Sequence, residues 1–205
     1  MKDLVISVAD SYQEKVIEVL LPRIPVSSNT RQFTYDIVRN IGNDSGSYND
    51  SHELLRPFIS AYRYAVVIFD FEGSGVEHIK TSEQAESDVE GMLSGNGWMD
   101  RNAACVISPE LENWMWIDNP NVERAIGWEK QQSLYEWARA EGLMSYEDSK
   151  PIRPKESLEQ ALRESDTSKS SAIYKKIAAN VSYRRCEDPA LIKLITKLQE
   201  WFPIV

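Results

Sequence analysis

The chain has 205 residues, of which 42% are hydrophobic, and a formal net charge of −9. This length allows one large domain or a domain with an appendage, and the composition allows a sizeable core. No stretch approaches the roughly 20 apolar residues of a membrane span. The first residues also lack the apolar region of a signal peptide, so we expect a soluble, cytoplasmic protein with no membrane partner.

Charge is distributed unevenly along the sequence. Residues 1–150 carry 13 basic against 25 acidic side chains, whereas residues 151–205 carry 10 against 7. The acidic balance argues against indiscriminate binding to nucleic acid, because affinity for phosphate grows with the number of basic contacts. The basic tail could hold a polyanion against the acidic body, but so small an excess is also typical of an ordinary solvated surface.

The amino-terminal half alternates strand and helix patterns. Short apolar or alternating runs predict strands, and apolar residues at helical spacing predict helices between them. The segment at 40–50, rich in Gly, Asn, Ser and Asp, predicts a mobile loop. This alternation favours a four-stranded, mainly parallel Rossmann-like α/β sheet with helices on both faces. The expected strands are residues 4–8, 31–38, 64–69 and 103–107, and the expected helices are 12–21, 52–61 and 82–93.

After the fourth predicted strand the pattern becomes helical. Four segments have apolar residues at helical spacing and are separated by Pro151, Pro154 and Pro189. We therefore predict an α/β domain over residues 1–118 and a helical cap or subdomain over 119–205 packed on it. The expected helices of the cap are residues 131–141, 155–164, 171–179 and 190–201.

Carboxylates follow two of the predicted strands. Asp70 and Glu72 come after the third strand, and Glu110 and Glu112 come after the fourth. The carboxyl ends of parallel strands form one rim, outside which ligands bind, so neighbouring strands would gather these four side chains. Clustered carboxylates repel one another, and a hard divalent cation such as Mg²⁺ relieves this repulsion. The alternative is that they are solvated loop acids, which are common in acidic proteins.

The order of these acidic motifs resembles the TOPRIM superfamily of topoisomerases, primases and OLD-type nucleases. In that superfamily a Glu after the first strand and an Asp-x-Asp pair after the third hold magnesium for phosphoryl transfer. Asp70 and Glu72 match the pair, with Glu in place of the second Asp. Most of the chain is similar to TOPRIM-like small proteins of bacterial phage-defence loci, including those of the methylation-associated defence system. The stretches that carry this resemblance are Val66–Gly75, Ser108–Trp116 and Ser182–Ala190.

The chain departs from the TOPRIM pattern after its first strand. Where the pattern has a Glu, this sequence has Ala9 followed by Asp10. Side chains alternate faces along a strand, so Asp10 reaches the same cavity only if the strand has ended. Asp10 could equally cap the first helix, with its carboxylate accepting amide hydrogen bonds. Both roles remain open for Asp10.

The segment after the fourth strand contains two carboxylates and two tryptophans. Glu110 and Glu112 share a face in a strand but diverge in a helix. We select Glu112 as a ligand because it matches the Pro-x-x-Glu-x-Trp form of the resembling proteins. Trp114 and Trp116 could stack on bases, although packing of the cap onto the sheet is the favoured interpretation.

Several further residues are candidates for contact with substrate. Gly73 and Gly75 resemble a phosphate-cradling turn, although an ordinary tight turn explains them better. Lys176, Arg184 and Arg185 are candidates for phosphate contact, the arginines being suited to bidentate binding. His52 and His78 could act as acid or base, but isolated histidines are more often structural.

These residues lead to one main prediction and two alternatives. We predict a magnesium- or manganese-dependent phosphoryl-transfer enzyme, a nuclease on DNA or RNA in antiphage defence, with other defence proteins as partners. Asp70, Glu72 and Glu112 would hold the metal, and Asp10 would complete the catalytic set. Ala9 motivates the first alternative, a non-catalytic interaction or nucleotide-sensing subunit of a defence complex. The second is an unrelated doubly wound protein that binds a small phosphorylated ligand.

Overall fold

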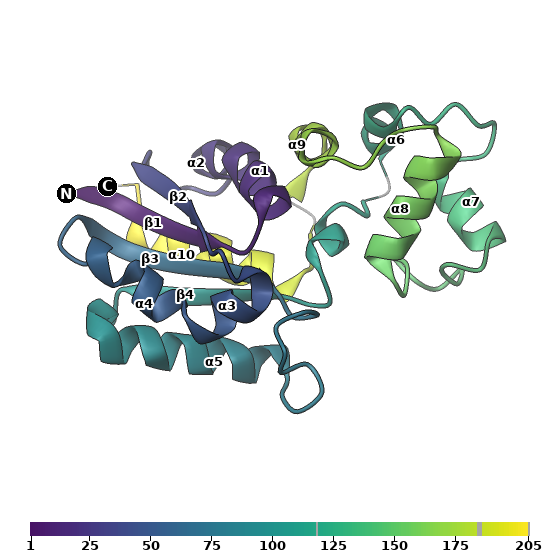
Figure 1. Ribbon diagram of the computed structural model, residues 1–205. Helices are drawn as coiled ribbons and strands as arrows, with labels where there is room; N and C mark the ends of the chain where they lie inside the picture. The colour runs from purple at the N-terminus through teal and green to yellow at the C-terminus, as the bar shows by residue number, and fades with distance from the viewer. Residues whose placement is uncertain (118, 184–185, 205) are drawn as a thin grey trace.

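The computed structural model describes residues 1–117, 119–183 and 186–204. Its centre is a four-stranded sheet in which all strands are parallel, in the order β2-β1-β3-β4 (Figure 1). Asp70 pairs in register with Ile107, so β3 and β4 end level with each other. The α/β fold class expected from the sequence is confirmed. The strands are β1 (Lys2–Val8), β2 (Tyr35–Arg39), β3 (Tyr62–Asp70) and β4 (Asn102–Ile107).

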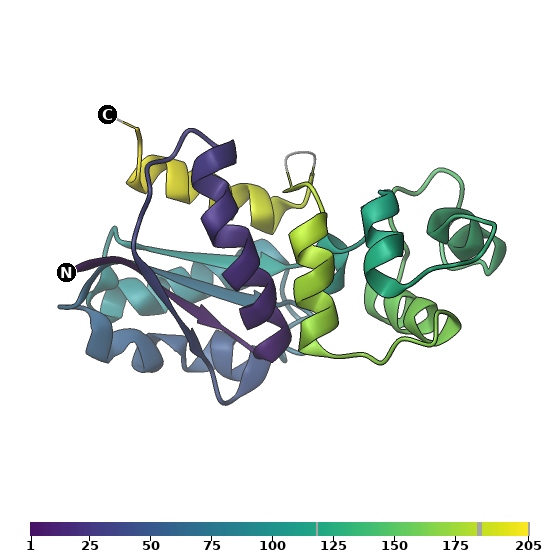
Figure 2. The same cartoon turned by 90° about the horizontal axis from the view of Figure 1, so that it is seen from above.

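Helices cover both faces of the sheet. On one face lie α1 (Ser11–Leu20) and α10 (Pro189–Trp201), which Figure 2 shows from above. The turn η1 (Leu21–Arg23) and the short helix α2 (Ile24–Ser27) continue directly from α1. The other face carries α3 (Asn43–Asn49), α4 (Ser51–Leu55), η2 (Arg56–Phe58) and α5 (Ser82–Leu93), which runs into the π-helical turn η3 (Ser94–Trp98). Successive strand residues enter the two cores alternately, as is usual for a parallel sheet buried on both sides.

The carboxyl-terminal third is divided between a helical lobe and the sheet. The lobe consists of α6 (Pro120–Ile126), α7 (Leu134–Ala140) and α8 (Pro154–Glu164), and α9 (Ser171–Asn180) lies between the lobe and α1 (Figures 1 and 2). Helix α10, however, returns to pack on β4. A helical unit was expected over 119–205, but its last helix belongs to the α/β layers. The predicted boundary at residue 118 falls outside the described residues.

Two stretches of local structure differ from the sequence expectation. The segment at 40–50 was expected to be a mobile loop, and this is wrong, because it contains α3. Its Gly, Asn and Ser residues have low helix propensity, so packing decides the conformation. Tyr48 is buried and donates to Asp88 at 2.8 Å, and a Cβ on Gly46 would lie 2.5 Å from Asn40 Oδ1, so the Asn40 side chain would have to move. Helix α6 was also missed.

The helices that the structure describes include no candidate for a membrane span, since each is too short or too polar.

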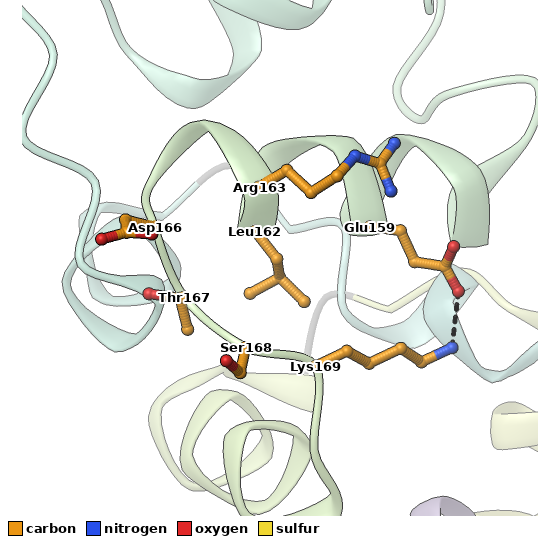
Figure 3. A pocket seen from close by; sticks show the side chains of 7 residues that line it. All are labelled: Glu159, Leu162, Arg163, Asp166, Thr167, Ser168 and Lys169. Atoms are coloured by element: carbon orange, nitrogen blue, oxygen red, sulfur yellow. Dashed lines mark hydrogen bonds and ion pairs between the residues drawn. The ribbon is translucent and has the colours of Figure 1, made fainter.

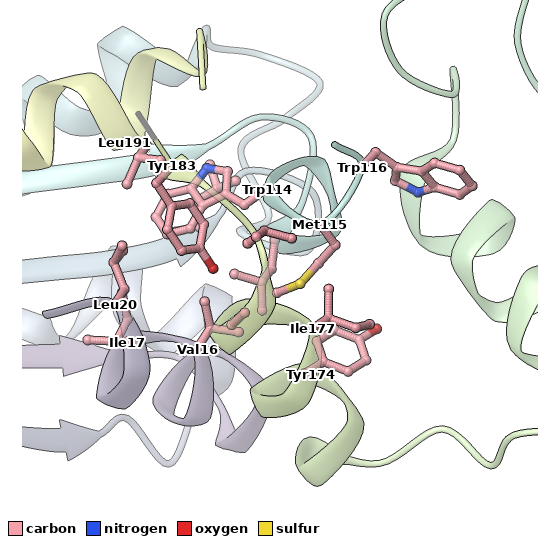
Figure 4. Packing of buried hydrophobic residues seen from close by; sticks show 14 of the residues in the cluster. Val16, Ile17, Leu20, Trp114, Met115, Trp116, Tyr174, Ile177, Tyr183 and Leu191 are labelled. Carbon is pink, nitrogen blue, oxygen red and sulfur yellow. The ribbon is translucent and has the colours of Figure 1, made fainter. Parts of the chain in front are cut away.

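The tryptophans after β4 are packing residues. Trp114 and Trp116 are 0% and 2% exposed, and they belong to the apolar core that joins the sheet face to the lobe (Figure 4). The Trp116 indole also donates to the backbone oxygen of Pro154 at 2.8 Å. Buried in this way, neither ring can stack on a nucleobase. The favoured interpretation, that these tryptophans attach the helical region to the sheet, is confirmed.

Candidate functional site

The carboxyl ends of the strands point towards α9 and the lobe (Figure 1). Several acidic residues lie at these strand ends. One ends β3 and another follows it, two follow β4, one follows β1, and one comes from α3. Each interacts electrostatically with at least one other member. We call this group the acidic rim, and it consists of Asp10, Asp44, Asp70, Glu72, Glu110 and Glu112.

Asp70 is at the centre of the acidic rim. Its Oδ1 accepts hydrogen bonds from the side-chain amide of Gln13 at 2.9 Å and from the backbone N–H of Leu111 at 3.0 Å. No Lys, Arg or His among the described residues is within ion-pair distance of this carboxyl. Burial, and then the negative charges of Asp44 and Glu112, hold the pKa of Asp70 well above its usual range. Asp70 is therefore a carboxylate whose charge is poorly compensated by the protein.

Asp44 is the rim residue that sequence reasoning missed. Its Oδ1 accepts the backbone N–H of Asp70 at 2.8 Å and lies 3.4 Å from the Gln13 amide nitrogen. Burial, with a contribution from the charge of Asp10, raises the pKa of Asp44. A signal was present, since Asp44 comes five residues after the last residue of β2, but the composition of that segment pointed to a loop.

Gln13 joins the two aspartates and was also not foreseen. The side chain is 1% exposed, and its Oε1 accepts the backbone N–H of Ala9 at 2.9 Å. This contact orients the amide so that its NH₂ group faces Asp70 and Asp44. Side chains in a helix point back towards its amino end, which is how a residue of α1 reaches the end of β1. A neutral amide thus lies beside Ala9 and faces both aspartates.

Asp10 caps the first helix. Its Oδ1 accepts the backbone N–H groups of Tyr12 and Gln13, both at 2.8 Å, so the capping interpretation is confirmed. The charge of Asp10 still raises the pKa of both Asp44 and Asp70. Asp10 therefore adds negative potential to the rim while one of its oxygens is engaged by backbone amides.

Glu110 and Glu112 diverge, because the chain forms the 3-10 helix η4 (Leu111–Trp114) here. Both side chains are buried, at 4% exposure, and each has its own partner. Glu112 accepts the hydroxyl of Tyr174 on α9, and Glu110 pairs with Lys155 on α8 at 2.7 Å. Burial raises the pKa of Glu110, although Lys155 opposes this. These two contacts tie the rim to the helices that follow it.

The remaining predicted residues are more exposed. Glu72 is exposed, and its charge acts on Glu110. Gly73 and Gly75 have φ values of +92° and +86°, and a Cβ on Gly73 would lie 3.6 Å from Asp44 Oδ2, so they form a tight turn beside the rim. Lys176 is exposed on α9. Arg184 and Arg185 lie outside the described residues.

The histidines do not join the rim. His78 is exposed, and His52 is on α4, with its Nε2 3.7 Å from Glu53 and its Nδ1 buried without a hydrogen-bond partner among residues 1–117, 119–183 and 186–204. Neither shows an interaction with a rim carboxylate in the part of the chain that the structure describes. The structure therefore gives them no role in acid–base chemistry at this site.

The arrangement of carboxylates limits the kind of metal site that fits. Among the described residues, no three His, Cys, Asp or Glu side chains are arranged to hold a metal ion. Asp70, Glu72 and Glu112 are not brought together as a three-carboxylate set, because Glu72 is exposed and Glu112 faces Tyr174. Mg²⁺ commonly uses only one or two carboxylates and keeps several waters for the rest of its shell. The adjacent pair of Asp70 and Asp44 fits that type of site.

Basic side chains lie on the lobe side of the rim. A hollow of about 400 Å³ at the end of α8 contains Arg163 and Lys169, and Figure 3 shows Lys169 paired with Glu159, at 2.6 Å. The ammonium group of Lys169 also lies over the ring of Tyr12, 5.1 Å from its centroid, at the start of α1. Basic groups are thus present next to the helix that Asp10 caps, and they were not foreseen from sequence.

In the comparisons with known proteins, no family model, no curated protein and no solved structure matches this chain. Fold and site together define a parallel α/β protein with an acidic rim at the carboxyl ends of its strands, attached to a helical lobe.

Proposed function

We propose that this protein is a magnesium-dependent phosphoryl-transfer enzyme, a nuclease that acts in the bacterial cytoplasm in antiphage defence. The observation that carries the proposal is the state of Asp70, which lies among like charges and has no cationic partner among the described residues. Such an arrangement is favourable when a cation binds. The assignment to defence comes from the resemblance of the sequence to small proteins of phage-defence loci.

Asp70 and Asp44 would hold the ion, with Glu72 approaching from the solvent side. A bound magnesium ion supplies charge that stabilises phosphate oxygens and lowers the pKa of a bound water. The hydrogen bonds from Gln13 and Leu111 fix the orientation of the Asp70 carboxyl. Asp10 adds negative potential without leaving its capping position.

A nucleic-acid substrate would need local positive charge, since the chain carries a net charge of −9. Arg163 and Lys169 line the hollow on the lobe, and Lys176 is exposed on the neighbouring helix α9. Arg184 and Arg185 remain candidates from sequence. We propose that these groups contact the phosphates that flank the one at the rim. Binding should accordingly weaken as the salt concentration rises.

A second candidate function is favoured by Gln13. Its amide donates to Asp70 at 2.9 Å and lies 3.4 Å from Asp44, so hydrogen bonding already offsets part of the repulsion. Together with Ala9, this supports a site that has lost catalysis. On this proposal the protein is a non-catalytic subunit that senses a nucleotide or binds other defence proteins.

Thermal unfolding in Mg²⁺ or Mn²⁺ separates the two functions. A metal that binds only the folded state adds about 1.4 kcal/mol at ten times its dissociation constant. We expect metal to raise the melting temperature of the wild-type chain and of Asp50→Asn, an exposed control, but not of Asp70→Asn. Metal-dependent cleavage of single-stranded DNA, duplex DNA or RNA should show the same pattern. If no metal stabilises the wild type, the non-catalytic function is favoured.

A further inference from the structure

Lys155 is the basic residue that the helical lobe places in the acidic rim. Its ammonium group lies 2.7 Å from Glu110 Oε1, and Glu110 is 4% exposed. Among the described residues, no other Lys or Arg forms an ion pair with a rim carboxylate. The charges of Glu110, Glu112 and Asp70 all raise the pKa of Lys155, against the effect of its own burial. Lys155 therefore responds to the centre of the rim as well as to its direct partner.

The backbone around Lys155 is held in place by buried contacts. Lys155 is the second residue of α8, directly after Pro154, and the Pro154 oxygen accepts the indole N–H of Trp116 at 2.8 Å. Trp116 and Pro154 are both buried. Because Trp116 comes from the same segment as Glu110 and Glu112, the hydrogen bond fixes the start of α8 against these carboxylates. The fold therefore holds the positive charge of Lys155 at the acidic rim.

We infer that Lys155 is an internal counter-cation that sets the affinity of the acidic rim for divalent metal ions. The inference rests on the metal site of the proposed function and adds the regulation of that site. With Lys155 in place, the rim is partly neutralised before any ion binds, and an arriving divalent ion is repelled by the resident ammonium group. The rim thus remains folded without metal but binds metal more weakly than its carboxylates alone would.

A titration with Mn²⁺ alone tests this inference. Free Mn²⁺ is measured by electron paramagnetic resonance, and the melting temperature is recorded at each concentration at constant ionic strength. We expect Lys155→Gln to lower the midpoint about fivefold, the order expected when one unit charge is removed near a divalent ion. Lys155→Arg, which keeps the charge, should retain the wild-type midpoint. Lys2→Gln removes a paired lysine at the opposite end of the strands and should also leave it unchanged.

A second pair of variants covers the case in which Lys155→Gln folds poorly because Glu110 is left buried and unpaired. The single variant Glu110→Gln retains an oxygen that can accept a hydrogen bond from Lys155. The double variant, Glu110→Gln together with Lys155→Gln, has no charge at either position. The midpoint for Mn²⁺ should fall from the single variant to the double variant, because the two proteins differ only in the charge of Lys155.

The outcomes distinguish this inference from the proposed function. Equal midpoints with and without Lys155, together with loss of Mn²⁺ binding in Asp70→Asn, would overturn the role of Lys155 and leave the metal site intact. The expected fall in midpoint without cleavage of any nucleic acid would support the role of Lys155 and contradict the nuclease. Absence of Mn²⁺ binding to the wild type and to every variant would overturn both.

Discussion

The side-chain amide of Gln13 donates a hydrogen bond to Asp70 at 2.9 Å and thereby links the first turn of α1 to the end of β3. These residues are 57 positions apart in the sequence. The same amide lies 3.4 Å from Asp44, so one neutral group lies between two carboxylates. Stability and the proposed metal binding at the rim are consequently coupled, because whatever removes negative charge from this point relieves the repulsion.

Asp70→Asn should stabilise the protein in the absence of metal at neutral pH. The pKa of Asp70 is raised on folding, so the carboxyl contributes most to stability when protonated and loses that contribution as the pH rises through its folded-state pKa. Asparagine is neutral at every pH and keeps an oxygen for Gln13 and Leu111. The melting temperature of the variant should exceed that of the wild type at pH 7 to 8, and the difference should shrink towards pH 4.

Melting curves between pH 4 and pH 8 in the presence of EDTA check this prediction. Asp50→Asn is the matched control, since Asp50 is exposed and its side chain does not cap α4. An Asp70→Asn protein that is less stable than the wild type throughout this range would show that the repulsion at the rim is small.

Gln13→Glu should destabilise the chain without metal and increase its response to metal. The substitution places a third carboxylate beside Asp44 and Asp70. It also removes the side-chain NH₂ group that donates to Asp70 and faces Asp44. We expect a loss of about 1–3 kcal/mol, the range for an unsatisfied buried polar group, and partial recovery in Mg²⁺ or Mn²⁺. Chemical denaturation with and without metal measures both effects. Gln131→Glu, at an exposed position, is the control, and equal metal responses in the two variants would contradict the prediction.

The strand-end acids could be predicted from sequence, whereas the groups that surround them could not. Asp70 is the last residue of the apolar strand β3, so its place at the carboxyl end of the parallel sheet depends only on local pattern. Glu112 comes five residues after the end of β4, in η4. Its partner, Tyr174, is 62 residues further along the chain, and their contact depends on how α9 packs against α1. Hydrophobic periodicity shows which face of a helix is apolar, but it does not show which distant element packs against that face.

Asp44 and Lys155 show the same limit from different causes. Asp44 is on α3, whose low helix propensity is overcome by packing against β1 and β3. Lys155 reaches Glu110 because a hydrogen bond between Trp116 and Pro154 places α8 at the rim. In both cases the partners are far along the chain, namely Asp70 and Gln13 for Asp44 and Glu110 for Lys155, and only tertiary structure determines them.

Tyr174→Phe should cost about 1–3 kcal/mol of unfolding free energy, because it removes the hydroxyl that donates to the buried carboxylate of Glu112. Tyr183→Phe is a matched control. The hydroxyl of Tyr183 is also buried, but it has no hydrogen-bond partner among the described residues, so its removal should cost little or should stabilise the protein. Urea denaturation of the two variants gives the comparison. Equal losses would mean that the contact with Glu112 contributes nothing beyond packing of the ring.

Lys193→Gln should destabilise the outer edge of the sheet. The backbone N–H groups of Ala104 and Val106 on β4 donate to the side chains of Glu90 and Glu86, at 3.0 and 2.9 Å. Lys193 of α10 pairs with both carboxylates, at 2.8 and 2.7 Å, and so holds them against the strand. Without the lysine, the two carboxylates repel each other, and the strand edge becomes available for pairing with another chain.

For Lys193→Gln we expect a loss of about 1–3 kcal/mol, because a hydrogen-bonded, partly buried charge loses its partner, and increased self-association. Lys197→Gln, one turn further along α10, breaks a surface pair with Glu200 and should change stability little. Urea denaturation gives the first quantity, and light scattering over a range of protein concentrations gives the second. If Lys193→Gln loses stability without any increase in self-association, the two carboxylates must still cover the strand edge unaided, and only the ion pairs would depend on Lys193.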